Sequence, residues 1–335
     1  MANANSIAVL GAGSWGTALA ILLGRNGADV RLWSHLPEHV RRLSEERENS
    51  EFLPGAPFPA TITPLGSLEQ ALSGAREVLL VVPSHAFGEV IQAIAPLLQP
   101  HMGLSWATKG FDPHSDRLLH EVAAEILGPS RDLAVISGPS FAKEVARGLP
   151  TAITVASPSA EHARRVARYL HSERFRAYTS RDIVGVQVGG AAKNVLAIAA
   201  GIADGLGFGA NTRAALITRG LKELTRLGIA LGGQAETFMG LAGLGDLALT
   251  CTDDQSRNRR MGLCLARGLS VEQAKAEIGQ EVEGVSATRV VHRRARELGV
   301  EMPICEQVYR VLYQGATPED ATHALLERSL KAEQD

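Results

Sequence analysis

Short apolar runs that end in polar or glycine-containing turns recur along the first half of the chain, with helically spaced stretches between them. The runs predict buried strands within residues 7–10, 30–33, 77–84, 103–110, 133–140, 151–156 and 175–178. Helices are predicted over residues 17–25, 36–49, 85–98, a stretch that ends at 147, and 160–171. Residues 52–64 contain four prolines and are expected to be irregular. Strands that alternate with helices indicate a doubly wound parallel sheet, which binds ligands at the carboxyl ends of its strands.

A Gly-x-Gly-x-x-Gly motif, formed by Gly11, Gly13 and Gly16, directly follows the first strand and opens the first helix. Gly11 allows the tight turn, Gly13 lets the backbone approach a pyrophosphate, and Gly16 lets the helix pack closely on its strand. The helix N-terminus then offers unpaired N–H groups and a positive dipole end to the phosphates. Between a strand and a helix, the motif predicts dinucleotide binding rather than a plain structural turn.

The pattern changes near residue 182, where long helical stretches rich in Ala, Leu and Gly replace the strand signals. We therefore expect a dinucleotide-binding domain over residues 1–182 and an all-helical, substrate-binding domain over residues 183–335. The expected fold class is α/β, with a Rossmann-type doubly wound N-terminal domain followed by an all-α C-terminal domain.

The end of the second strand bears on the choice of dinucleotide, because an acidic residue there binds the ribose 2′-hydroxyl of NAD. This chain instead has Ser34 and His35, with Arg31 nearby, and the nearest carboxylate is Glu38. Since no acid is placed to repel a 2′-phosphate, NADP is allowed as well as NAD, and we expect NADPH to be preferred. In the alternative interpretation, these residues only begin a polar loop.

Composition restricts the cellular location and the kinds of partner that we expect for this chain. The 335 residues are 45% hydrophobic and 21% charged, with a net charge of −2, so no global field favours nucleic acid or an anionic membrane. The first six residues lack the pattern of a signal peptide. Three widely spaced cysteines and ten histidines without ligand spacing argue against a disulfide framework or a metal site. We expect a cytoplasmic enzyme that acts on a small molecule, without a nucleic-acid partner or membrane insertion.

Lys193 is the only charged residue between Ile183 and Ala203, a segment whose length alone would suggest a membrane span. The central lysine and the glycines argue against a span and favour a buried helix. A buried ammonium is costly and has a lowered pKa, which suits proton exchange with a hydroxyl or a carbonyl. The alternative is a lysine that reaches solvent from a surface helix.

Asp246 follows a stretch with three glycines, which predicts a loop whose backbone approaches a ligand. Its carboxylate would orient Lys193 or accept a substrate hydroxyl, although a helix N-cap is an equally simple interpretation. Gly138 and Ser140 follow the strand predicted within residues 133–140. Ser140 is expected to cap the next helix, at a place that also binds anions.

Ser256, Arg257 and Asn258 place a hydroxyl, a guanidinium and an amide side by side. Because Arg supplies bidentate charged donors, this combination suits a clamp for phosphate or carboxylate. The alternative is a solvated basic helix start.

Together these stretches resemble the NAD(P)-dependent glycerol-3-phosphate dehydrogenases of the bacterial biosynthetic type. The similar motifs in the first domain are Gly-Ala-Gly-Ser-Trp-Gly-Thr-Ala at 11–18, Ala-Thr-Lys-Gly at 107–110 and Ser-Gly-Pro-Ser-Phe-Ala at 137–142. Those in the helical domain are Ala-Ala-Lys-Asn-Val at 191–195, Asn-Thr-Arg-Ala-Ala-Leu-Ile-Thr-Arg-Gly at 211–220, Gly-Leu-Gly-Asp-Leu at 243–247 and Ser-Arg-Asn-Arg at 256–259. The resemblance implies a domain plan like that of 6-phosphogluconate dehydrogenase. It also implies reduction of dihydroxyacetone phosphate to sn-glycerol 3-phosphate for glycerophospholipid synthesis, and it is compatible with a homodimer.

The resemblance further implies roles for single residues, with Lys193 as the proton acceptor for the secondary hydroxyl. The implied substrate-binding residues are Lys109, Gly138, Ser140, Lys193, Asp246, Ser256, Arg257 and Asn258. The implied cofactor-binding residues are Gly11, Gly13, Ser14, Trp15, Gly16, His35, Lys109, Ala142, Arg257, Glu281 and Glu283. The family tends to have an aliphatic residue at position 281, so the contact implied there is with the backbone.

Two other functions fit parts of the sequence. A β-hydroxyacid or 6-phosphogluconate-type dehydrogenase shares the domain plan and a catalytic lysine, but needs a carboxylate-binding pocket. A regulator that senses NAD(P) without catalysis would need a DNA-binding module or a basic patch, and neither is visible in the sequence.

Overall fold

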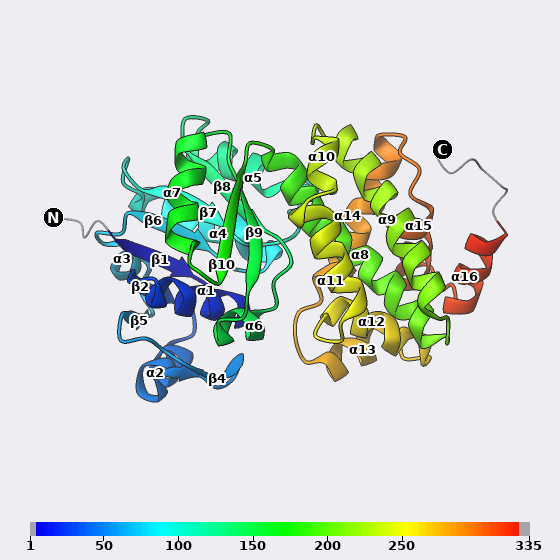
Figure 1. Cartoon of the computed structure of the whole chain (residues 1–335), viewed down its shortest axis with the longest axis horizontal. Coiled ribbons are helices and arrows are strands. Elements are labelled where there is room, and N and C mark those ends of the chain that lie inside the picture. Colours follow the sequence, from blue (N-terminus) through cyan, green and yellow to red (C-terminus); the bar gives the residue numbers. More distant parts are fainter. Residues whose placement is uncertain (1–4, 328–335) are drawn as a thin grey trace.

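The computed structural model describes residues 5–327 and contains two unlike halves, a twisted sheet between helices and a helical bundle (Figure 1). The sheet has eight strands in the order β10-β9-β8-β7-β6-β1-β2-β5. In chain order its strands are β1 Ser6–Leu10, β2 Asp29–Trp33, β5 Ile62–Leu65, β6 Glu77–Leu80, β7 Gly103–Trp106, β8 Leu133–Ser137, β9 Thr151–Ala156 and β10 Phe175–Ser180. The chain first builds the sheet outward from β1 through β2 and β5, and then continues at β6 on the other side of β1. Such a reversal creates the crevice where open α/β sheets bind ligands.

Helices cover both faces of the sheet, because the buried strands are apolar on both faces. Ile7 and Val9 of β1 belong to one apolar cluster, and Ala8 and Leu10 belong to the cluster on the opposite face. The first cluster includes residues of α1 (Ser14–Arg25), α6 (Ala142–Arg147) and α7 (Ala160–Leu170). The second includes residues of α3 (Leu68–Leu72), α4 (Ser84–Ile94) and α5 (Leu119–Leu127). The predicted doubly wound arrangement is confirmed.

Two local predictions for this half are wrong. The stretch 52–64 is partly regular: after α2 (Pro37–Glu46), β3 (Glu48–Asn49) pairs with β4 (Leu53–Pro57), and β5 then begins. Pro64 is tolerated in β5 because an edge strand needs no N–H toward solvent.

The sheet is also not wholly parallel, because β9 runs antiparallel to β8. The connection between them contains only the six-residue α6. A helix of that length spans about 9 Å, which is too short to return the chain to the opposite end of the sheet.

The second half is helical throughout its described residues, as predicted, and α8 (Ile183–Gly205) lies at its centre. Around α8 pack α9 (Ala210–Ala230), α11 (Asp246–Thr252), α12 (Arg257–Ala266) and α14 (Glu283–Glu297). The other helices are α10 (Ala235–Phe238), α13 (Val271–Ile278), α15 (Pro303–Tyr313) and α16 (Pro318–Leu326). By length and composition α8 could cross a membrane, but 94% of its apolar window is buried inside the protein. It is therefore a core helix.

Candidate active site

The glycine-rich loop lies at the reversal point between β1 and β6. Gly11 has a φ of +120°, and a Cβ there would lie 2.4 Å from the carbonyl oxygen of Val81, just beyond β6. A Cβ on Gly16 would lie 1.8 Å from the carbonyl oxygen of Gly11. Gly13 differs, because it is exposed and nothing lies within 4 Å of the position of a Cβ there. Two glycines thus fix the turn, and the third leaves open space beside it.

The N-terminus of α1 fits an anionic group. Gly13 stands at its N-cap position, no side chain caps the helix, and its first turn contains no acidic residue. Free N–H groups and the positive end of the helix dipole favour a phosphate at such a place. Ser14 Oγ donates a hydrogen bond of 2.6 Å to the carbonyl of Phe52, and Trp15 packs against the cluster beneath the loop. The chemistry and the open space therefore fit a dinucleotide pyrophosphate.

At the end of β2, the residues considered for ribose recognition point in different directions. Ser34 is buried, and its Oγ lies 3.1 Å from Nδ1 of His39. The Arg31 guanidinium lies about 3.9 Å from the position of a Cβ on Gly74. His35 is exposed at the carboxyl end of β2. Among Arg31, Ser34 and His35, only His35 is open to a ligand at that end of the strand.

Three charged side chains meet where the two halves touch. Asp246, the first residue of α11, accepts a hydrogen bond of 2.5 Å at Oδ1 from Nζ of Lys193 on α8. Its Oδ2 accepts one of 2.6 Å from Nζ of Lys109, which lies beyond the end of β7 and also donates to the carbonyl of Gly138. Lys193 donates a further hydrogen bond of 2.7 Å to Thr250 Oγ1. Lys193 is 5% exposed and Asp246 1%, so the alternative of a lysine that reaches solvent is wrong.

The electrostatics of this cluster favour proton exchange. Burial lowers the pKa of Lys193 to about 8; attraction by Asp246 opposes that shift, and repulsion from Lys109 adds to it. Two ammonium groups share one carboxylate, so the cluster carries an excess positive charge when both lysines are protonated. A lysine with a pKa close to neutral pH can both give and take a proton.

The glycines before Asp246 do not form the predicted open loop. Leu241–Gly245 is a π-helical turn that runs directly into α11. A Cβ on Gly243 would lie 2.1 Å from the carbonyl oxygen of Phe238, and one on Gly189 of α8 would lie 2.4 Å from that of Ala242. These glycines therefore allow the turn to pack on α8, which brings Asp246 to Lys193.

The segment after β8 lies beside Lys109. Gly138 has a φ of +151°, and its carbonyl accepts hydrogen bonds of 3.0 Å from both Lys109 Nζ and Ser140 Oγ. The expectation that Ser140 caps a helix is wrong, because α6 begins at Ala142 and Phe141 occupies the N-cap position. Ser140 instead fixes the direction of the Gly138 carbonyl, and Ala142 lies at the start of the helix next to this group.

The predicted Ser-Arg-Asn clamp is the N-terminus of α12. Ser256 Oγ accepts a hydrogen bond of 3.2 Å from the Arg259 N–H, so Ser256 is the N-cap. Asn258 Nδ2 donates to Asn194 Oδ1 at 2.9 Å, and Asn258 Oδ1 accepts from the Gly284 N–H at 2.9 Å. Since Asn194 follows Lys193, the Asn258 side chain ties α12 and α14 to the lysine-bearing part of α8.

Glu283 connects the helical half to the sheet. It is the first residue of α14 and accepts a hydrogen bond of 2.8 Å from Ser84 Oγ at the start of α4. Burial raises the pKa of Glu283, while the Ser84 hydrogen bonds oppose that shift. Arg257 and Glu281 are exposed, and the carboxylates of Glu283 and Glu281 attract the Arg257 guanidinium. This group therefore lies near the carboxyl end of β6, on the side of the reversal point opposite β2.

Comparison with known proteins decides the family. Residues 6–163 match the NAD-dependent glycerol-3-phosphate dehydrogenase N-terminus, and residues 182–323 match the C-terminus of the same family. The chain belongs to this family. The glycerol-3-phosphate dehydrogenase (NAD(P)+) of Aeromonas salmonicida is 58% identical over 334 residues, which cover 99% of this chain and 100% of the relative. The one from Methylococcus capsulatus is 57% identical over 330 residues, 98% of each chain.

Solved structures agree with the family assignment. The crystal structure of glycerol-3-phosphate dehydrogenase from Coxiella burnetii is 50% identical, covers 97% of this chain and 99% of its own, and superposes with a TM-score of 0.94. The Saccharomyces cerevisiae enzyme, at 24% identity and a TM-score of 0.83, shows the same fold. The resemblance inferred from the motifs and the predicted fold class are thus confirmed.

Two side chains next to Lys193, those of Thr250 and Asn194, were not predicted as parts of the site. Thr250 accepts a hydrogen bond from Lys193, and Asn194 holds Asn258. The signal for Thr250 was its position four residues after Asp246, which places both on one face of α11. Asn194 directly follows Lys193, but adjacent residues of a helix point in different directions, so sequence proximity did not reveal its partner.

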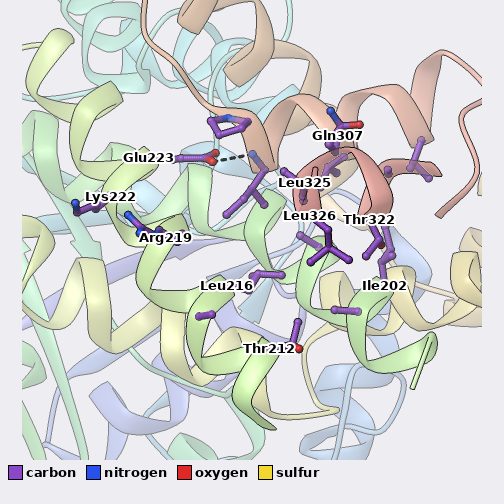
Figure 2. Close-up of a pocket in the computed structure, with 18 of the residues that line it drawn as sticks. Ile202, Thr212, Leu216, Arg219, Lys222, Glu223, Gln307, Thr322, Leu325 and Leu326 are labelled. Atoms are coloured by element: carbon purple, nitrogen blue, oxygen red, sulfur yellow. Dashed lines mark hydrogen bonds between the residues drawn. The ribbon is translucent and has the colours of Figure 1, made fainter. Parts of the chain in front are cut away.

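A cavity of about 460 Å³ lies away from this cluster, among α8, α9, α15 and α16 (Figure 2). Its lining is mostly apolar and includes Leu216, Leu325 and Leu326, and it contains none of the predicted site residues. The buried Glu223 carboxylate borders it and accepts hydrogen bonds of 2.7 and 3.1 Å from the N–H groups of Ile304 and Cys305. Burial raises the pKa of Glu223 to about 7, against those two hydrogen bonds.

Proposed function

We propose that this chain is an NAD(P)-dependent sn-glycerol-3-phosphate dehydrogenase that reduces dihydroxyacetone phosphate to sn-glycerol 3-phosphate, the precursor of glycerophospholipids. The observation that carries the proposal is the buried Lys193–Asp246 pair, with the half-buried Lys109 beside it, at the edge of the dinucleotide crevice. It supplies a proton-exchanging group beside the place where the sheet is built to bind a dinucleotide. The family membership of the whole chain supports the same activity.

When bound, NADPH or NADH would supply hydride for the reduction of the substrate carbonyl. The pyrophosphate would lie against the glycine-rich loop and the free N–H groups at the start of α1. NADPH is preferred in this proposal because His35, rather than a carboxylate, is exposed at the end of β2. The remaining contacts are assigned to Ser14, Trp15, Lys109, Ala142, Arg257, Glu283 and the backbone at Glu281.

Lys193 is assigned the proton transfer. During reduction its ammonium group donates a proton to the carbonyl oxygen, and during oxidation its neutral amine takes the proton of the hydroxyl. Asp246 and Thr250 hold the Nζ atom in place, and Lys109 lowers its proton affinity. Much of the rate would come from holding the reacting groups in this geometry.

The substrate phosphate is assigned to Ser256, Arg257 and Asn258 at the N-terminus of α12. Arg257 is exposed and provides charged, paired donors, while the helix N-terminus favours an anion. Lys109, Gly138 and Ser140 would line the other side of the small substrate. We also propose that residues 1–182 and 183–335 form the two domains, because α8 begins three residues after the last sheet residue, Ser180.

We further propose a cytoplasmic homodimer that does not insert into a membrane. Burial of α8 supports the last point. Self-association is supported by large apolar side chains that are exposed on the helical half, namely Ile229, Met239, Leu298 and Leu326. The molar mass of the full-length protein in solution tests it, and a monomeric mass across the micromolar range would refute it.

The central test follows the nicotinamide absorbance of NADPH and NADH with dihydroxyacetone phosphate, in parallel with 3-keto acids. Oxidation with the phosphate ester is expected, with a higher kcat/KM for NADPH. Turnover of the keto acids alone would favour the hydroxyacid dehydrogenase alternative, and binding of NADPH without any turnover would favour a sensor. A Lys193→Ala protein that kept the wild-type rate would refute the assigned proton transfer.

A further inference from the structure

Asn49, in the short strand β3, is a buried polar residue outside every role assigned above. It is 1% exposed. Its Nδ2 donates hydrogen bonds of 2.8 Å to the carbonyl of Ala12 and of 2.8 Å to Thr17 Oγ1. Its Oδ1 accepts one of 3.1 Å from the Phe52 N–H and lies 3.3 Å from Nε2 of His39. One amide thus binds the glycine-rich loop, helix α1, the β3–β4 turn and helix α2.

The chemistry of the partners fixes the direction of each hydrogen bond. A backbone carbonyl can only accept and a backbone N–H can only donate, so Asn49 must turn Nδ2 to Ala12 and Oδ1 to Phe52. Nε2 of His39 must then donate to Oδ1, which leaves Nδ1 of His39 to accept from Ser34 Oγ at 3.1 Å. The buried chain therefore runs from the loop carbonyl through Asn49 and His39 to the end of β2.

Ala12 lies between Gly11 and Gly13, so the backbone on both sides of it has little conformational preference of its own. The Asn49 amide holds the Ala12 carbonyl by a hydrogen bond, and this fixes the direction in which the N–H groups of the following turn point. Through His39 the same amide is linked to Ser34, next to the exposed His35. The pyrophosphate end and the ribose end of the proposed cofactor site are thus joined by side chains that are buried.

We propose that Asn49 is a positioning residue for dinucleotide binding. Its side chain holds the glycine-rich loop in its binding geometry and fixes the position of the loop relative to the end of β2. This inference rests on the proposed NAD(P)-dependent function. Asn49 acts before the cofactor arrives, so its loss weakens cofactor binding while the proton transfer at Lys193 continues. The substrate-binding residues assigned to the helical half are not part of this chain of hydrogen bonds.

The test compares Asn49→Ala with Asn26→Ala in the full-length protein. Asn26 is a matched control at the other end of α1, where its Nδ2 donates to the carbonyls of Tyr169 and Leu170 at 2.9 and 3.2 Å. Binding of NADPH and NADH is measured by fluorescence titration without substrate, and steady-state rates give kcat and both KM values. For Asn49→Ala we expect the Kd and KM of the cofactor to rise by about tenfold, because the two Nδ2 hydrogen bonds that hold the loop and helix α1 are lost. The kcat at saturating cofactor and the KM of dihydroxyacetone phosphate should stay within about twofold, and Asn26→Ala should leave all values within about twofold.

Thermal unfolding of each variant separates a positioning role from a structural one. If Asn49→Ala does not fold, Asn49→Asp takes its place, because it keeps the shape but turns a carboxylate oxygen toward the Ala12 carbonyl; the same changes are expected. His39→Ala is expected to weaken cofactor binding, and its effect should be less than additive with that of Asn49→Ala since both act through one chain. An unchanged cofactor Kd in a folded Asn49 variant would overturn the proposal. An equal effect of Asn26→Ala would also overturn it. So would a fall in kcat together with a rise in both KM values. If the wild-type protein itself binds neither dinucleotide, the proposed function is wrong and this role falls with it.

Discussion

Lys193 has two charged neighbours, Asp246 and Lys109, and they should shift its pKa in opposite directions. Lys109→Met removes a positive charge and should raise the pKa of Lys193, whereas Asp246→Asn removes a negative charge and should lower it. The two ammonium nitrogens lie 2.6 and 2.5 Å from the two oxygens of Asp246. For two ammonium groups on the two oxygens of one carboxylate, an assumed separation of roughly 5 Å and an effective dielectric constant of about 20 give about 3 kcal/mol, or a change of about 2 in pKa.

The assay is the pH dependence of kcat/KM for reduction of dihydroxyacetone phosphate between about pH 5 and 11 at constant ionic strength. Reduction requires protonated Lys193, so kcat/KM should fall above its pKa, near pH 8 in the wild type. The bend should move to higher pH in Lys109→Met and to lower pH in Asp246→Asn, whatever the loss in absolute rate. Lys143→Met removes the same charge from an exposed position on α6 and should leave the bend in place. Bends that stay fixed, or that move in the same direction in both cluster variants, would refute the electrostatic reasoning.

Three further predictions concern the loop, the clamp and the helical core. Gly16→Ala places a Cβ 1.8 Å from a backbone oxygen and should lower the free energy of unfolding, measured in urea, by about 3 kcal/mol. Gly13→Ala, at the open position, should change the free energy of unfolding little and still raise the KM of the cofactor. Arg257→Ala should raise the KM of dihydroxyacetone phosphate by about 10- to 100-fold through loss of charged hydrogen bonds, and Arg267→Ala at the far end of α12 serves as the control; equal KM values would exclude the clamp. The folded-state pKa of Glu223 is raised to about 7 from an ordinary value of 4.5, so its contribution to stability is complete below pH 4.5 and is lost as the pH rises through 7. Urea unfolding should therefore show wild-type stability falling over that range by about 3 kcal/mol relative to Glu223→Gln, and parallel pH profiles would contradict it.

The features that could be predicted from the sequence were those that depend on local spacing or local composition. The distances between Gly11, Gly13 and Gly16 predicted the turn and its open position, because each glycine serves the backbone within a few residues. The apolar surroundings of Lys193 favoured its burial, because a helix that is apolar on all sides packs in the core. The alternation of strands and helices predicted the sheet and hence the edge at which Lys109 and Gly138 lie.

What could not be predicted depends on contacts between distant segments. The sequence does not reveal that Lys109 reaches an Asp246 that lies 137 residues further on, because that contact depends on how the helical half packs on the sheet. The glycines before Asp246 suggested an open loop, and only packing on α8 turns them into a helical turn. The hydrogen bonds of Asn49 could not be predicted for the same reason, because asparagine in a polar stretch is ordinary and its partner Ala12 lies 37 residues earlier.

The position of Lys109 on the sheet half, and of Lys193 and Asp246 on the helical half, links proton affinity to the distance between the halves. Moving them apart carries Lys109 away from Lys193 and lets water in, and both changes raise the pKa of Lys193 while Asp246 stays with it. In an opened molecule the lysine therefore holds its proton firmly. With the halves in contact as they are here, Lys109 lies on Asp246 and makes the same proton easier to give. Lys193 is therefore the stronger acid when the two halves touch.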